Sequence, residues 1–297
     1  MKAMILAAGL GTRLRPLTND RPKALVTLAG RTLLEITLSR LRSSGVTDVI
    51  VNVHHHAQLI VDYLKANNNF GMRIEISLEE NLLNTGGGLK NAAHFFSDTR
   101  GEPFILHNVD VLSSIDLEYM VSFHTKQRAL ATLAVQQRES SRQLLFDEAG
   151  QLCGRRIGAD GEIELVHFHN NPEIAPCPIP DAAPCPIHSR SLRMGGKAQN
   201  PISENYENAL VDPSDKIQPL AFAGIHVLSP LIFEKMEEQG VFSIIDAYLH
   251  LVAQGEKIVA FRADGYYWRD LGHPENLLEA AQDIASGKYS NPEKPSL

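Results

Sequence analysis

The sequence predicts an α/β fold built on a doubly wound, mostly parallel Rossmann-like sheet, with a small β-ribbon and loop insertion. Two observations lead to this prediction. Short apolar or β-branched runs alternate with runs whose apolar residues recur at helical spacing, which is typical of βαβ units. A glycine-rich basic segment follows the first apolar run, and loops beyond the carboxyl ends of parallel strands are where such folds bind ligands.

The first half of the chain contains four predicted strands separated by predicted helices. The strands are expected within residues 1–9, 46–55, 73–80 and 103–110. The helices are expected within residues 32–45, 57–71 and 88–96. Because the carboxyl ends of parallel strands meet at one edge of a sheet, Asp110 at the end of the fourth strand is expected near the loop after the first.

The second half is less regular. Residues 143–169 resemble a two-stranded ribbon with turns at Ala149-Gly150 and Asp160-Gly161, and a proline-rich irregular loop is expected over 171–220. A strand at 220–228 follows, and then a helix at 229–240 with Ser229 as its N-cap and Pro230 as its first residue. The remaining elements are expected as a helix within 242–255, two strand-like pieces within 257–272 and a helix within 273–287.

Composition excludes several classes of protein. The 297 residues carry a formal net charge of −7, which argues against nucleic acid as the main partner. The three cysteines form no even-numbered disulfide framework, the first apolar run is too short for a signal peptide, and no run is long enough to span a bilayer. These features predict a single reduced, cytoplasmic domain over 1–297 with no membrane insertion.

The segment GLGTRLRPLTNDRPK, residues 9–23, reverses the charge of the chain locally. It holds Arg13, Arg15, Arg21 and Lys23 beside two glycines, whose freedom to turn lets backbone N–H groups point at an anion. A dinucleotide fingerprint would need a third glycine, and a P-loop would need Gly-Lys-Ser/Thr. Neither is present, so the segment predicts another kind of anion site, with a merely solvated basic loop as the alternative.

Residues 4–25, MILAAGLGTRLRPLTNDRPKAL, resemble the signature of the sugar-1-phosphate nucleotidyltransferases, also called NDP-sugar pyrophosphorylases. The similarity continues more thinly to about residue 112 and resumes at 221–278. The resemblance implies a nucleotide-binding half over 1–130 and a sugar-phosphate half over 131–297. It also implies that Arg13 grips the leaving pyrophosphate and Lys23 contacts the α-phosphate and the sugar phosphate. The backbone expected to hold the nucleotide comprises Leu6, Ala7, Ala8, Gly9, Gly11 and Thr12, together with Arg13.

The same resemblance implies a magnesium site. Asp110, in HNVD, matches the family's metal-binding aspartate, and Asp270, in WRDLGHP, matches the second one, with His273 where the family usually has Thr. Carboxylates suit a hard cation that also takes phosphate oxygens. The alternative for each is an aspartate that turns the chain, since Asp is a favoured turn residue.

The segment LLNTGGGLKNA, residues 83–93, resembles the L-x-T-G-G-G of N-acetylmuramate-1-phosphate uridylyltransferases, which implies that Thr85, Gly86 and Gly87 lie against the base and favours UTP. FAGIHV resembles the family's strand beside the sugar, which makes Gly224 a candidate contact. Trp268 is expected to pack rather than to stack on a base.

Together these features predict transfer of a nucleotidyl group from NTP to a sugar 1-phosphate, with Mg²⁺ as cofactor, for cell-wall or surface-polysaccharide precursors. UTP and an N-acetylated sugar 1-phosphate are favoured as substrates. Three alternatives stay open: a mannose- or heptose-1-phosphate guanylyltransferase, a glycosyltransferase that uses an NDP-sugar, and a non-catalytic module that binds nucleotide sugars.

Overall fold

The structure, a computed structural model, describes residues 1–99, 101–158, 161–166 and 217–290. Most of the expected loop at 171–220 lies outside these residues, and its last three residues begin a strand instead. Among the described residues, no helix is long and apolar enough to cross a membrane.

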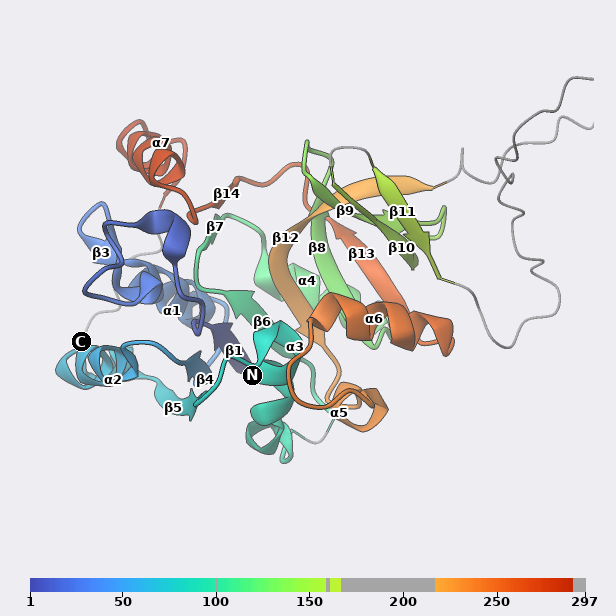
Figure 1. Cartoon of the computed structure of the whole chain (residues 1–297), viewed down its shortest axis with the longest axis horizontal. Helices are drawn as coiled ribbons and strands as arrows, with labels where there is room; N and C mark the ends of the chain where they lie inside the picture. Colours follow the sequence, from blue (N-terminus) through green and yellow to red (C-terminus); the bar gives the residue numbers. More distant parts are fainter. Residues whose placement is uncertain (100, 159–160, 167–216, 291–297) are drawn as a thin grey trace, which may run out of the picture.

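A ten-stranded mixed sheet forms the centre of the molecule (Figure 1). In its first half, β1 pairs in parallel with β4 and β6, and β4 pairs in parallel with β5. These strands span Lys2–Leu6 (β1), Asp48–Val53 (β4), Arg73–Leu78 (β5) and Phe104–Asn108 (β6). The largely parallel order and the crossover helices confirm the predicted fold class.

The long strand β12 joins this half to the rest of the sheet. It is antiparallel to β6, β8 and β9, while β13 pairs in parallel with β8. These strands span Ala131–Gln136 (β8), Arg142–Phe146 (β9), Gln218–Leu228 (β12) and Ile258–Arg262 (β13). The predicted ribbon is present as β9 with β10 (Leu152–Ile157) and β11 (Glu162–Leu165), which extend the sheet at one end (Figure 1).

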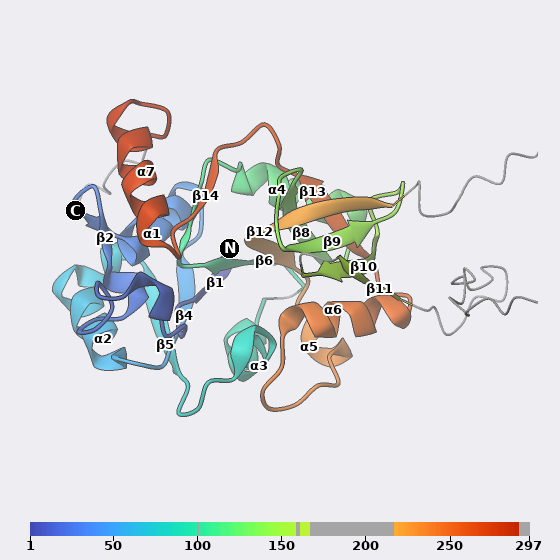
Figure 2. The same cartoon turned by 45° about the horizontal axis from the view of Figure 1, so that its top comes forward.

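Helices cover both faces of the sheet and enclose two separate cores (Figure 2). Side chains alternate between the two faces of a strand, so neighbouring residues of β1 belong to different cores. Ala3 and Ile5 lie in the first core and Met4 lies in the second. The first core takes α1 (Leu33–Ser43), α2 (Ala57–Ala66), α4 (Leu117–Gln127) and α7 (Pro274–Ala285). The second takes α3 (Asn84–Asn91), α5 (Ile232–Lys235) and α6 (Ile244–Ala253).

Helix α1 shows how local sequence specifies these elements. The Thr32 hydroxyl caps it by accepting a hydrogen bond from the Glu35 N–H at 3.0 Å, which is worth about 1 kcal/mol. Leu34, Leu38 and Leu41 recur at helical spacing and are fully buried, and each contributes about 2 kcal/mol by burial. The predicted helix at 32–45 is thereby confirmed within two residues at each end.

The helix predicted at 229–240 is wrong in extent. Helix α5 begins only after Leu231 and ends before Met236, and Ser229 is not its N-cap, although its hydroxyl accepts from the Leu231 N–H. The backbone turns extended at Met236, with φ −71° and ψ 118°. Beyond the helix, the Lys90 ammonium of α3 donates to the carbonyls of Met236 and Glu238, so a tertiary contact holds this non-helical segment.

Two very short sheets complete the fold and shape the site. Strand β7 (Val111–Ser113) pairs antiparallel with β14 (Trp268–Asp270), and β2 (Thr27–Leu28) pairs with β3 (Arg31–Thr32). The first pair matters most here, because it brings the segment after β6 against the segment before α7.

Candidate active site

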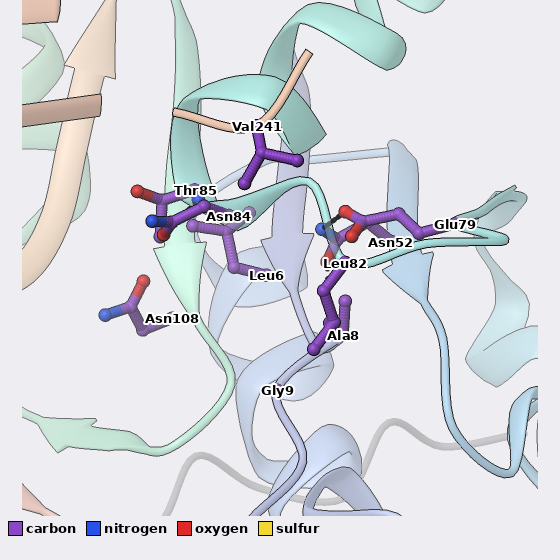
Figure 3. Close-up of a pocket in the computed structure, with 10 residues that line it drawn as sticks. All are labelled: Leu6, Ala8, Gly9, Asn52, Glu79, Leu82, Asn84, Thr85, Asn108 and Val241. Carbon is purple, nitrogen blue, oxygen red and sulfur yellow. Dashed lines mark hydrogen bonds between the residues drawn. The ribbon is translucent and has the colours of Figure 1, made fainter. Parts of the chain in front are cut away.

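Two adjoining cavities lie at the carboxyl ends of the parallel strands. The first measures about 470 Å³ (Figure 3). It is lined by Leu6, Ala8, Gly9, Asn52, Glu79, Leu82, Asn84, Thr85, Asn108 and Val241. The second measures about 620 Å³. It is lined by Arg13, Asn108, Asp110, Val111, Arg138, Ser140, Ser141, Arg142, Phe222, Ala223, Gly224, Trp268 and Asp270. Because Asn108 lines both, ligands in the two cavities would lie next to each other.

A buried network shapes the first cavity. Asn52 accepts from the Ala7 and Ala8 N–H groups through Oδ1, at 2.7 and 3.3 Å. It donates through Nδ2 to Glu79 Oε1 at 2.6 Å (Figure 3). Glu79 Oε2 accepts from the Leu83 N–H at 3.0 Å. Asn52 and Glu79 are almost wholly buried. The network therefore fixes the loop after β1 against the turn that leads into α3.

The loop after β1 uses its two glycines differently. Nothing lies within 4 Å of the position that a Gly9 side chain would take, and Gly9 lines the first cavity. Gly11 has φ +63°, and a side chain there would meet Thr18 at 3.1 Å and Lys23 at 3.2 Å. The Thr18 hydroxyl also donates to the Gly11 carbonyl at 2.8 Å. Gly11 thus permits a compact left-handed turn, whereas Gly9 leaves room for a ligand.

The glycines of α3 have a packing role that the sequence did not predict. A side chain on Gly86 would lie 2.3 Å from the Phe242 ring, and one on Gly87 would lie 2.2 Å from the Gly240 carbonyl oxygen. The N–H groups of both glycines donate to the Phe242 carbonyl. Close approach here is therefore between α3 and the segment before α6, and a base contact by Gly86 and Gly87 stays a prediction.

Thr85 and Asn84, in contrast, face the first cavity (Figure 3). The Thr85 hydroxyl accepts from the Ile244 N–H at 3.0 Å, which fastens the start of α3 to the start of α6. Of the predicted nucleotide-binding residues, Leu6, Ala8, Gly9 and Thr85 line this cavity. Ala7 is buried, does not line this cavity, and donates its N–H to Asn52.

The pairing of β7 with β14 brings the two predicted metal ligands together. Asp270 is opposite Val111 in the register, and the Leu271 N–H donates to the Asp110 carbonyl at 2.7 Å. Both carboxylates line the second cavity, although 160 positions separate them in the sequence. The structure thus places Asp110 and Asp270 in one site.

The predicted cations converge on the same point. Lys23 forms a partly buried ion pair with Asp110. A side chain built on Gly272 would lie 2.9 Å from Asp270 Oδ1 and 3.3 Å from both Arg13 Nη2 and Lys23 Nζ. The four charged groups therefore surround one small volume, and a glycine at 272 keeps that volume open.

His273 supports Arg13 at this point. Its Nε2 lies 2.8 Å from Arg13 Nη1, and it is the residue that precedes α7. Because a guanidinium only donates, the imidazole nitrogen accepts this hydrogen bond. The histidine that departs from the family's usual threonine therefore orients the guanidinium.

Gly224 lines the second cavity in a conformation that favours glycine. Its φ is +75°, and a side chain there would lie 2.7 Å from Val111 and 2.9 Å from the Asn108 amide. Trp268 lines the second cavity, not the first, and its indole N–H donates to the Ala223 carbonyl at 2.8 Å. A contact between Gly224 and a sugar stays a prediction.

Sequence reasoning missed Asn52, Glu79 and Arg138. Asn52 interrupts the apolar run VIVNV, and a polar residue in a buried strand was a usable signal. Glu79 directly follows strand β5, at the edge where ligands bind. Arg138 lies in a charged stretch after β8, and nothing in the sequence distinguishes it from its neighbours.

Comparisons with known proteins agree with this geometry. A family model described as Nucleotidyl transferase matches residues 2–144 and 202–287, more than half of the chain. The chain is 30% identical over 290 residues to N-acetylmuramate alpha-1-phosphate uridylyltransferase of Caulobacter vibrioides, covering 95% of this chain and 96% of that protein. It is 27% identical to mannose-1-phosphate guanylyltransferase of Mycobacterium tuberculosis, covering 98% of this chain and 66% of that protein.

Solved structures show the same fold at lower identity. HddC from Yersinia pseudotuberculosis superposes with a TM-score of 0.64 at 20% identity, covering 95% of this chain and 99% of that one. UDP-glucose pyrophosphorylase complexed with UDP-glucose gives a TM-score of 0.63 at 18% identity, covering 96% and 98%. The family match confirms the resemblance found in residues 4–25. The chain therefore belongs to the nucleotidyl transferase family and is an enzyme of the nucleotidyltransferase class.

Proposed function

We propose that the protein transfers a uridylyl group from UTP to an N-acetylated sugar 1-phosphate, giving a UDP-sugar and pyrophosphate. The observation that carries this proposal is that Arg13, Asp110 and Asp270 line one cavity, which adjoins the first through Asn108, and that Lys23 pairs with Asp110 at its edge. In this assignment the nucleoside occupies the first cavity and the sugar phosphate the second. The transferring phosphate then lies between them, beside the charged groups.

The choice of substrates rests on the relatives. Similarity to the N-acetylmuramate alpha-1-phosphate uridylyltransferase extends over nearly the whole of both chains and supports UTP with an N-acetylated sugar. Glu79 favours the alternative, a guanylyltransferase, because a carboxylate lining the base cavity suits the N–H donors of guanine. Each Glu79 oxygen already accepts one hydrogen bond, from Asn52 or from Leu83, and the similarity to the uridylyltransferase over nearly the whole chain keeps UTP as the preferred assignment.

The proposed chemistry needs charge stabilisation more than proton transfer. An oxygen of the sugar phosphate attacks the α-phosphorus in line, and pyrophosphate leaves from the opposite side. No general base is required, because the attacking oxygen is already an anion. Lys23 would neutralise the α-phosphate and the sugar phosphate, and Arg13, held by His273, would bind the leaving pyrophosphate.

The carboxylates fit a divalent cation such as Mg²⁺. In the described part of the chain, no three His, Cys, Asp or Glu side chains gather as a metal cluster. Mg²⁺ typically takes only one or two carboxylates and completes its shell with phosphates and water, so Asp110 and Asp270 suffice as ligands. When bound, the ion would supply positive charge at the phosphates. The four side chains sum to zero formal charge, so they alone cannot balance two anionic substrates.

A panel assay tests the proposal. The protein is incubated with Mg²⁺, each NTP in turn and a set of sugar 1-phosphates, and pyrophosphate release is measured. Release with UTP and an N-acetylated sugar 1-phosphate is expected, at a rate at least ~10-fold above that with GTP, about what one well-placed hydrogen bond supplies. Preference for GTP would replace the uridylyl assignment, and absence of release with every pair would reject the nucleotidyl transfer.

Since UTP is a cytoplasmic metabolite, we place the proposed reaction in the cytoplasm, where it would supply cell-wall or surface-polysaccharide precursors.

A further inference from the structure

Arg138 is a cation that the proposed phosphate chemistry does not use. It follows β8 and lines the second cavity with its side chain half-buried. One Nη donates to the Phe222 carbonyl at 2.9 Å. Its Nε is shielded from solvent and has no hydrogen-bond partner. No carboxylate of the described residues forms an ion pair with it, which is unusual because a buried charge normally has a partner.

The guanidinium is also fixed in place. Its central carbon lies 3.8 Å from the centre of the Trp268 ring, a close cation–π contact. The Trp268 indole is itself anchored to the Ala223 carbonyl. Burial lowers the pKa of the Arg138 guanidinium and the charge of Asp270 raises it, but the guanidinium stays protonated. The cavity therefore presents a rigid, charged donor group with unused hydrogen-bonding capacity.

The strand β14 sets the distance from Arg138 to the phosphate end. Trp268 and Asp270 are two residues apart, so their side chains project to the same side about 7 Å from each other. Arg138 lies over Trp268, whereas Lys23 and Arg13 lie beside Asp270. A sugar whose 1-phosphate lies at Asp270 would thus extend its ring toward Arg138.

We infer that the sugar 1-phosphate carries a carboxylate, and that Arg138 binds this carboxylate and so determines which sugar is used. The inference rests on the proposed function and deepens it. A guanidinium forks onto a carboxylate with two hydrogen bonds, and a substrate carboxylate would supply the direct ion-pair partner that the described residues do not give Arg138. Ser140 and Ser141, on the same wall, offer hydroxyls to neutral groups of such a substituent.

Two substrates that differ in one substituent test this inference. N-Acetylmuramic acid 1-phosphate has a lactyl carboxylate, and N-acetylglucosamine 1-phosphate lacks it but is otherwise the same. Pyrophosphate release is measured with saturating NTP, and kcat/KM is compared for the two sugars. We expect the wild type to prefer the carboxylated sugar about 50-fold or more, which is what a charge-assisted pair of hydrogen bonds supplies.

Two variants distinguish a direct contact between Arg138 and the sugar carboxylate from a general attraction by the positive charges of the cavity. Arg138→Gln should remove most of that preference while leaving kcat/KM for the neutral sugar within about 3-fold, which also shows that the variant is folded. Arg142→Gln is the matched control, because Arg142 lines the same cavity with an exposed side chain. It should keep the preference.

Three outcomes would overturn the inference. The wild type could use both sugars equally, Arg138→Gln could weaken both sugars to the same degree, as loss of a phosphate contact would, or Arg142→Gln could abolish the preference as fully as Arg138→Gln. Each of these leaves nucleotidyl transfer intact. Absence of turnover with either sugar and every NTP rejects the proposed function itself, and the inference with it.

Discussion

Exchanging the polar groups of Asn52 and Glu79 tests whether their hydrogen bonds shape the first cavity, which we propose binds the nucleotide. Asn52→Asp keeps the oxygen that accepts from the Ala7 and Ala8 N–H groups, but it puts a second carboxylate at the 2.6 Å contact with Glu79. Glu79→Gln keeps an oxygen for the Leu83 N–H, but it turns an amide NH₂ toward the Asn52 NH₂. Each single change therefore brings two groups of the same kind into contact in a buried position: two carboxylates in Asn52→Asp and two NH₂ donors in Glu79→Gln.

The expected costs follow from these contacts. Two carboxylates in contact cannot both ionise, so Asn52→Asp should lower the free energy of unfolding by about 3–5 kcal/mol. Glu79→Gln leaves buried donors unpaired and should cost about 1–3 kcal/mol. The double variant restores every bond, since the new Asp accepts from Ala7, Ala8 and the new Gln, and Gln Oε1 accepts from Leu83. It should recover to within about 1 kcal/mol of the wild type, a coupling of at least about 3 kcal/mol.

The assay pairs denaturant unfolding with steady-state kinetics. Stability is taken from urea titrations of the four proteins, and KM for NTP is taken from pyrophosphate release. Asn52→Asp should raise KM for NTP more than KM for the sugar phosphate, and the double variant should restore both. Additive destabilisation, with the double variant the least stable of the four, would refute the assigned hydrogen-bond network.

Four further outcomes are expected. Lys23→Ala should lower the rate of pyrophosphate release ~10²-fold or more, and a near-wild-type rate would remove Lys23 from the mechanism. Asp110→Asn and Asp270→Asn should each abolish Mg²⁺-dependent turnover, with a combined effect far below additive; additive losses would mean that the two carboxylates act separately. Gly87→Val places a side chain against a backbone carbonyl 2.2 Å away, so it should lower the melting temperature, and an unchanged value would contradict this packing. Burial and the neighbouring His107 lower the pKa of His226 to about 3, so the unfolded chain binds its proton first and stability should fall as pH drops from about 6.5 toward 3. His226→Gln should flatten that slope in urea titrations across this range, and an unaltered slope would contradict it.

The sequence was most informative where local chemistry determines local structure. The alternation of strands and helices in the first half predicted the parallel strands β1, β4, β5 and β6, and the structure confirms them. Residues 9–23 could be predicted as an anion site because glycines and cations cluster there in the sequence itself. The functional class followed from the same stretch, and the family match confirms it.

Prediction was weaker where tertiary contacts decide the outcome. The helix expected at 229–240 has good local propensity, but the chain leaves the helical conformation at Met236 and its next carbonyls accept from the Lys90 ammonium instead. The glycines at 86 and 87 predicted close approach to a ligand, which stays a prediction, and the structure adds a close approach to the segment at 240–242 that spacing alone could not identify. Arg138 gave no signal, because its significance depends on a tryptophan 130 positions away.

The register of β14 connects the fold to both ends of the second cavity. Trp268 and Asp270 project to one side of this three-residue strand, so one register places both the aromatic surface under Arg138 and the carboxylate beside Lys23. Arg269 projects to the other side, where it pairs with Asp283 of α7 at 2.6 Å. A shift by one residue would exchange these sides and remove both groups from the cavity. The ion pair to α7 opposes that shift, so a helix outside the cavity helps to keep Trp268 and Asp270 on the cavity side at a fixed separation.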